Sequence, residues 1–183
     1  ELLEASPAAA NALEDAFGWR PLLFAAHAGD AGLLELLVGA RADVRASCHR
    51  GNTALHLAAA GGHAQATALL VGAGADVEAQ SVQGWTPLIW SAITGQDQAA
   101  AALLSRRAAP AVRDAEGRTA CMWAARHGHR GVMRTLLATG GVDLAVKDND
   151  GLTLRDHAKE YETLRRTFGQ VGSRSLSLSS SVE

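Results

Sequence analysis

A repeat of 33 residues runs through most of this chain of 183 residues. Gly18, Gly51, Gly84 and Gly117 stand 33 residues apart, and Gly151 follows after 34. Each of the first four glycines is followed eleven residues later by another glycine, and a pair of aliphatic residues then recurs at a shared position. Self-similarity at this period is typical of proteins built from small stacked units. The sequence therefore predicts a stack of units, each packed on its neighbours.

Each unit reads as helix, turn, helix and loop. Four units carry a threonine two residues after the opening glycine, where its hydroxyl can cap a helix: Thr53, Thr86, Thr119 and Thr153. Pro21 and Pro87 fall in the first turn of that helix, where the missing N–H costs no hydrogen bond. The second glycine separates the two helices, and the residues from Gly74 to Val77 supply turn chemistry that leads into the connecting loop.

The segments Thr53-Ala-Leu-His-Leu-Ala and Thr86-Pro-Leu-Ile-Trp-Ser resemble the Thr-Pro-Leu-His-x-Ala signature of the ankyrin-repeat family. The resemblance covers about residues 2–168. It implies an all-α ankyrin-repeat solenoid of helix-turn-helix units joined by β-hairpin-like loops. It also implies a non-enzymatic, protein-binding role, because the family serves as a scaffold in adaptors, transcription-factor inhibitors, ubiquitin-ligase receptors and channel tails.

On this alignment, residues 1–17 are the tail of a truncated N-terminal repeat, and residues 18–50, 51–83, 84–116 and 117–150 are four ankyrin repeats. Residues 151–168 are expected to form a C-terminal capping repeat, and residues 169–183 a flexible Ser-rich tail. The chain begins without methionine, so we expect it to be an excerpt from a longer protein. The second helices of the two middle repeats are rich in alanine, which predicts a less stable middle of the stack.

Composition and charge restrict the possible partners and the compartment. The 17 basic and 19 acidic residues give a net charge of −2, which does not favour direct binding of nucleic acid. No segment approaches the roughly 20 apolar residues that cross a membrane, so no membrane insertion is expected. Cys48 and Cys121 occupy different positions of the repeat, and we expect two free thiols in the cytoplasm or the nucleus.

Catalytic, cofactor and metal sites are not expected. His127 and His129 flank a glycine, but His129 shares the position of His63 in the turn between two helices, which favours a structural role over metal binding. Cys121 is expected on the buried face of a first helix. Cys48 is expected near an exposed loop tip, where it is a modifiable thiol and not a nucleophile.

The family resemblance implies a concave groove, lined by the hairpin tips and by the exposed side of the first helices, as the partner-binding surface. The corresponding residues are Phe17, Trp19, His27, His49, Arg50, Asn52, Val82, Gln83, Trp85, Ile93, Thr94, Glu116, Arg118, Arg126 and His127. Trp and Arg are frequent binding hot spots, so the expected partner is a protein segment with apolar and acidic features. Trp85 is the expected anchor, between Arg50 and Arg118, which would hold carboxylates. Trp19 and Trp85 have an alternative role, in which they only cover adjacent hairpins.

Other residues are assigned by their position in the repeat. Trp90 and Trp123 share the position of Phe24 and Leu57, which predicts packing between neighbouring first helices. The family's histidine is present only as His56, so its hydrogen bonds to neighbouring loops are expected in that repeat alone.

Three hypotheses concern regulation and context. Ser177 follows Arg174 by three residues and is a possible phosphorylation site. One alternative function is that of a regulatory or targeting ankyrin segment of a larger enzyme, channel or ubiquitin-ligase subunit. Self-association through an incompletely capped first repeat is another.

Overall fold

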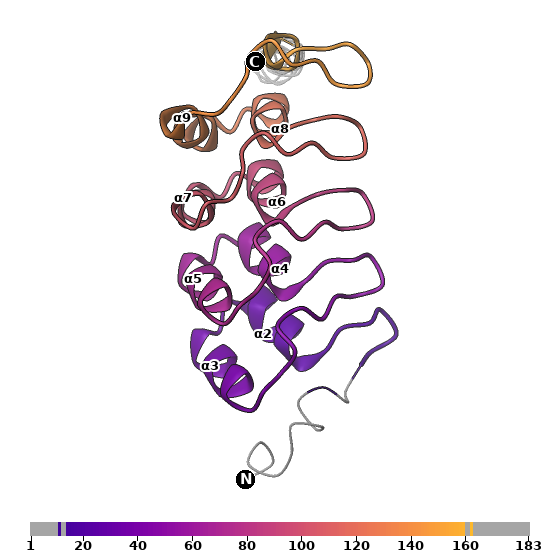
Figure 1. The fold of residues 1–183 in the computed structure, drawn as a ribbon, viewed down its shortest axis with the longest axis vertical. Helices are drawn as coiled ribbons and strands as arrows, with labels where there is room; N and C mark the ends of the chain where they lie inside the picture. The colour runs from indigo at the N-terminus through magenta and orange to yellow at the C-terminus, as the bar shows by residue number, and fades with distance from the viewer. Residues whose placement is uncertain (1–10, 12–13, 160–161, 163–183) are drawn as a thin grey trace, which may run out of the picture.

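The helices of the chain form two parallel columns. The computed structural model describes residue 11, residues 14–159 and residue 162. The helix pairs are α2 (Pro21–Ala28) and α3 (Ala31–Gly39), α4 (Ala54–Ala60) and α5 (Ala64–Gly72), α6 (Pro87–Thr94) and α7 (Asp97–Ser105), and α8 (Ala120–His127) and α9 (Arg130–Thr139). A further helical stretch covers residues 154–159. Figure 1 shows the first helix of each pair in one column, the second in the other, and the connecting loops projecting to one side.

The projecting loops are hairpins that hydrogen-bond to one another. In the second hairpin the Cys48 N–H donates to the Asn52 carbonyl at 2.9 Å. The Val82 N–H of the third hairpin donates to the Arg50 carbonyl of the second at 3.0 Å. Equivalent bonds between neighbouring hairpins run from His49 to Phe17, from Ala115 to Gln83 and from Asn149 to Glu116. Within the described residues the β pairing is limited to isolated bridges, so the fold is an all-α solenoid with hairpin loops.

Threonine caps begin the first helices, as predicted. The hydroxyl of Thr86 accepts from the Ile89 N–H at 3.2 Å. The hydroxyl of Thr119 accepts from the Met122 N–H at 3.4 Å. At the start of α4, His56 Nδ1 accepts from the Thr53 N–H at 3.1 Å. Pro21 and Pro87 are the first residues of α2 and α6. The local sequence therefore determines where these helices begin.

Small residues form the contact between successive first helices. Two adjacent positions of the first helix are buried and small in every described pair: Ala25 and Ala26, Ala58 and Ala59, Ser91 and Ala92, and Ala124 and Ala125. Larger side chains from the second helices complete the core: Leu37, Leu70, Leu103 and Leu136. The interior is closely packed, so any cavity at the surface depends on the size of the side chains beside the hairpins.

The two cysteines are both unpaired and buried. Burial raises the pKa of Cys121 to about 11, which keeps the thiol protonated, as predicted for a buried helix face. The expectation of an exposed Cys48 is corrected, because its side chain is only 7% exposed. Cys48 stands at the start of its hairpin, the position of Asp114 in the fourth, and this side of the hairpin faces the core.

Several predictions concern residues outside the described part of the chain. They include most of the truncated N-terminal repeat, the capping repeat beyond residue 159, the Ser-rich tail and the phosphorylation site Ser177. Among the described residues, no helix is both long enough and apolar enough to cross a membrane.

Candidate functional site

A pocket of about 550 Å³ opens between the first three hairpins and the first helices, on the surface that the family resemblance implies as the groove. Its lining residues are Phe17, Trp19, His27, Cys48, His49, Arg50, Asn52, Leu57, Ala60, Gln83, Trp85 and Trp90. Eight of these belong to the predicted surface: Phe17, Trp19, His27, His49, Arg50, Asn52, Gln83 and Trp85. The structure thus brings about half of the predicted residues around one cavity.

The pocket lies over the second repeat because that repeat carries short side chains at two positions. The residue after the opening glycine is Trp19, Asn52, Trp85 and Arg118 in successive repeats. The residue near the end of the first helix is His27, Ala60, Ile93 and Arg126. Asn52 and Ala60 therefore leave unfilled the space that larger groups occupy in the other repeats.

Aromatic contacts hold the walls of the pocket in place. The rings of Trp85 and Trp90 meet at 87° with centroids 5.1 Å apart, and those of Trp19 and His27 meet at 76° and 5.4 Å. Edge-to-face pairs contribute about 0.5–1.5 kcal/mol beyond area burial. The Trp90 Nε1–H also donates to Asn52 Oδ1 at 3.2 Å, which fixes the indole plane. The walls are therefore ordered before any partner arrives.

Behind the pocket, a buried carboxylate connects two tryptophans. Oδ2 of Asp114 accepts from Nε1–H of Trp85 at 3.1 Å and of Trp123 at 2.7 Å. Its other oxygen accepts from the backbone N–H groups of Glu116 and Arg118. Four donors offset the cost of burying this charge. Trp85 thus contacts the next hairpin, which was the alternative role considered for it, and it also lines the pocket. Its role as the anchor for a partner stays a prediction.

Arg50 and His49 are exposed basic side chains at the pocket, while the carboxylate of Asp114 lies behind Trp85. Arg50 is exposed, and no described side chain forms an ion pair or hydrogen bond with its guanidinium. His49 Nε2 lies 3.5 Å from Glu14 Oε1. None of the described residues that line the pocket carries a carboxylate.

The exposed Arg50 guanidinium can pair with an anion at the edge of the pocket. Inside the pocket, aromatic faces attract a cation by about 0.5–2 kcal/mol, and the Asp114 carboxylate behind Trp85 does not oppose it. An acidic group is therefore expected beside Arg50 and not within the aromatic cavity.

The C-terminal part of the predicted surface is occupied by the protein's own contacts. Arg118 Nε lies 3.3 Å from Asp148 Oδ2, and its Nη2 lies 3.2 Å from Asp150 Oδ2. Its guanidinium carbon also lies 5.1 Å from the centre of the Trp123 ring. With its side chain only 13% exposed, Arg118 does not present the free charge that was expected to hold a partner's carboxylate.

The remaining predicted residues lie outside the pocket. Val82, Glu116 and His127 are exposed, while Ile93, Thr94 and Arg126 are partly buried. His127 stacks on Trp123 at 5.8 Å, and partial desolvation, followed by the charges of His129 and Arg126, lowers the pKa of His127 although its side chain is still largely exposed. His127 is therefore neutral near pH 7 and adds no charge to the groove.

Sequence reasoning missed four lining residues: Cys48, Leu57, Ala60 and Trp90. Trp90 was predicted to pack between neighbouring first helices; its ring contacts Trp85 and its Nε1–H bonds to Asn52, both in hairpins, and it also lines the cavity. The sequence feature that could have located the pocket is Ala60, because it is smaller than the residues at this position in the other repeats. Histidines in the turns behave as predicted, since His63 Nε2 lies 3.1 Å from the His27 carbonyl oxygen and His129 Nε2 lies 3.1 Å from that of Ile93.

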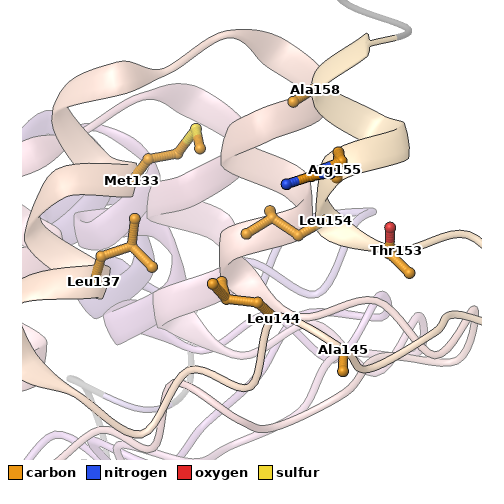
Figure 2. A pocket seen from close by; sticks show the side chains of 8 residues that line it. All are labelled: Met133, Leu137, Leu144, Ala145, Thr153, Leu154, Arg155 and Ala158. Atoms are coloured by element: carbon orange, nitrogen blue, oxygen red, sulfur yellow. The ribbon is translucent and has the colours of Figure 1, made fainter.

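A second pocket, of about 640 Å³, lies at the C-terminal end of the described stack. Figure 2 shows Met133 and Leu137 of α9 on one side and Leu154 and Ala158 on the other. The lining is apolar except for Thr153 and Arg155, and no predicted site residue belongs to it. The chain continues with residues 160–161 and 163–183, which are outside the part that the structure describes.

The comparison with known families agrees with this architecture. The family model for ankyrin repeats in three copies matches residues 1–81 and 65–148. The chain therefore belongs to the ankyrin-repeat family, whose members are generally protein–protein interaction modules built on a non-catalytic fold. No curated protein matches the chain. Among the described residues, no group of three or more His, Cys, Asp or Glu side chains is placed to hold a metal ion.

Proposed function

We propose that this chain is a non-enzymatic interaction module, an adaptor or scaffold, that binds a partner protein in the N-terminal half of its concave groove. The pocket over the second repeat is the observation that supports this most, because ordered aromatic walls surround an unfilled cavity of about 550 Å³. Aromatic and Arg side chains at such sites concentrate binding energy.

The partner segment has apolar and acidic features. Phe17 on the first hairpin and Val82 on the third are 70% and 73% exposed, so apolar side chains flank the hairpin of Arg50 on both sides. Burying such surface contributes about 25 cal/mol per Å². Arg50 supplies the attraction for a carboxylate. Arg118 is already paired with carboxylates of this chain. The acidic residue of the partner segment is therefore expected next to Arg50 and not next to Arg118.

The same groove serves a free-standing adaptor or a regulatory segment of a larger enzyme, channel or ubiquitin-ligase subunit. The two unpaired thiols support placing the protein in the cytoplasm or nucleus. Self-association is the third possibility, and it predicts a sedimentation coefficient that rises with protein concentration.

A pair of photo-crosslinking residues tests the position of the binding surface. Benzoylphenylalanine replaces Phe17 in the groove or, as the matched control, Leu36 on α3, which is 61% exposed. We expect the position at Phe17 to form a covalent adduct with one defined partner in cells, and the position at Leu36 to form none. Adducts from Leu36 alone would place the binding surface on the second helices instead.

A further inference from the structure

The second repeat differs from its neighbours at two positions that line the concave groove. Asn52 stands where the adjoining repeats carry Trp19 and Trp85. Ala60 stands where the third repeat carries Ile93. Asn52 and Ala60 both line the pocket, so the cavity is a local consequence of short side chains in an otherwise regular stack.

The shape of the cavity suits an aromatic ring. Trp19 and Trp85 line it from two hairpins and Trp90 from α6. Trp85 and Trp90 already meet at 87°, so an incoming ring can meet either of them in the edge-to-face or offset geometry that aromatic pairs prefer. A volume of about 550 Å³ is enough for one ring with the backbone next to it.

The surroundings favour a peptide over a small molecule. Phe17 and Val82 extend the apolar surface along the row of hairpin tips. A peptide that crosses these tips covers both side chains, whereas a small molecule confined to the pocket leaves Val82, which lies outside the lining, in water. Apolar surface that is left exposed contributes nothing to the affinity.

We infer that the pocket over the second repeat receives one aromatic side chain of a partner's peptide segment, and that Arg50 binds a carboxylate within two residues of that ring. This inference rests on the proposed function and identifies the part of the partner that the groove selects. The carboxylate follows from the exposed Arg50 guanidinium, which has no ionic partner among the described residues, and from a lining without carboxylates. A lysine at the position of that carboxylate would be repelled by the Arg50 guanidinium.

Three variants of the full chain separate the two contacts. Ala60→Ile introduces the residue that the third repeat carries at this position, so it fills the pocket with a group the fold accommodates. Ala60→Ser is the matched control that leaves the pocket open. Arg50→Gln removes the charge and keeps a polar side chain. Circular dichroism melts first establish that all three variants are folded.

Short random peptides displayed on phage are then selected against the unmodified chain, and dissociation constants of the synthesised peptides are measured by tryptophan fluorescence. We expect the peptides to share an aromatic residue with Asp or Glu within two positions. Ala60→Ile should weaken binding at least about tenfold, while Ala60→Ser should change it less than about threefold. Arg50→Gln should weaken binding about tenfold at low salt and less at high salt.

The alternative results are distinguishable. One result is a set of peptides that bind this chain but not its Phe17→Ser variant, and that keep binding when their own aromatic and acidic residues are replaced. Such peptides overturn this inference and leave the proposed function intact. If binding of the selected peptides changes in none of the variants at Phe17, Arg50 and Ala60, both are overturned. Phenylacetate that binds as tightly as the peptides would assign the pocket to small ligands, which also overturns the inference.

Discussion

The indole N–H of Trp85 donates to Oδ2 of Asp114 at 3.1 Å, so a side chain that lines the candidate pocket is fixed to the next hairpin. Trp123 donates to the same oxygen at 2.7 Å. The carboxylate thereby connects the third and fourth repeats through two tryptophans. Because of this connection, loss of binding in Trp85→Ala would not by itself locate a binding hot spot.

The first prediction concerns the stability that Asp114 contributes. Asp114→Ala leaves two indole and two backbone N–H groups without their acceptor, and each unsatisfied buried donor is costly. We expect the free energy of unfolding to fall by about 3 kcal/mol in urea titrations. Asp43→Ala is the control, because the exposed Asp43 carboxylate accepts from the Arg45 N–H of its own turn. Equal losses in the two variants would mean that the shared carboxylate is energetically unimportant.

The second prediction separates two arginines that are both near the groove. Arg50→Ala removes a guanidinium with no described partner, so the free energy of unfolding should change by less than about 0.5 kcal/mol. Arg118→Ala removes a partner of the buried Asp148 and should lower it by about 2 kcal/mol. Partner binding should be affected more by Arg50→Ala than by Arg118→Ala. Arg50→Ala should slow association and make the association rate less dependent on salt. Stopped-flow kinetics and urea titrations on both variants measure this. If Arg118→Ala is as stable as the unmodified chain but fails to bind, Arg118 and not Arg50 is the arginine that contacts the partner.

The third prediction concerns pH and His56. Burial lowers the pKa of His56 to about 4, although hydrogen bonds to the Trp85 and Ala79 carbonyls and the charge of Asp76 oppose this shift. The unfolded chain, in which His56 has its ordinary pKa of 6.5, therefore binds a proton more strongly than the folded chain does. The stability from neutral His56 is fully present above pH 6.5 and is lost as pH falls toward 4. The loss amounts to at most about 3 kcal/mol.

Urea titrations between pH 7 and pH 4 measure this loss. His56→Leu is the matched variant, because the first repeat carries Leu23 at this position. The variant should be less stable at pH 7, where it lacks the hydrogen bonds of His56, but its stability should fall less steeply with acidity. Parallel pH profiles would show that His56 does not cause the acid sensitivity.

The fourth prediction uses two glycines that stand two residues apart. Gly74 has φ +92°, which an L side chain rarely adopts, whereas Gly72 ends α5 in a helical conformation. A Cβ at either glycine meets no atom within 4 Å, so packing does not distinguish them. Gly74→Ala should destabilise the protein by about 1 kcal/mol through backbone strain. Gly72→Ala should stabilise it by up to about 1 kcal/mol.

Thermal melts of both variants provide the measurement. Arg107, which occupies the position of Gly74 in the next repeat, has φ 67° and offers an independent check. Arg107→Gly should relieve strain and raise the melting temperature. A decrease for Arg107→Gly together with an increase for Gly74→Ala would show that unfolded-state entropy, and not backbone strain, dominates at these turns.

Much of the fold was predictable because its signals are local. Thr86 caps α6 and Pro87 begins it through contacts within one turn, so a few neighbouring residues are sufficient to specify the start of the helix. The period of 33 residues then indicates that the same unit stacks repeatedly.

The candidate site depended on contacts that the repeat pattern does not reveal. Arg118 occupies the same position as Trp19 and Trp85, but its partners Asp148 and Asp150 lie in the next hairpin, 30 and 32 residues away. Cys48 was misplaced for a related reason, since which side of the hairpin faces the core is settled by packing between repeats.

The sequence by itself determined the helix starts, because these follow from residues close together in the chain, and the repeat, because its period recurs in the sequence. The groove was an implication of the family resemblance. Only the tertiary structure decided which part of the groove is open. Stacking brings the short Asn52 and Ala60 side chains between Trp19 and Trp85, and the cavity arises from the difference in volume across three repeats. The same stacking neutralises Arg118 with carboxylates while Arg50 keeps its charge exposed, because electrostatic partners depend on distance in space and not along the chain.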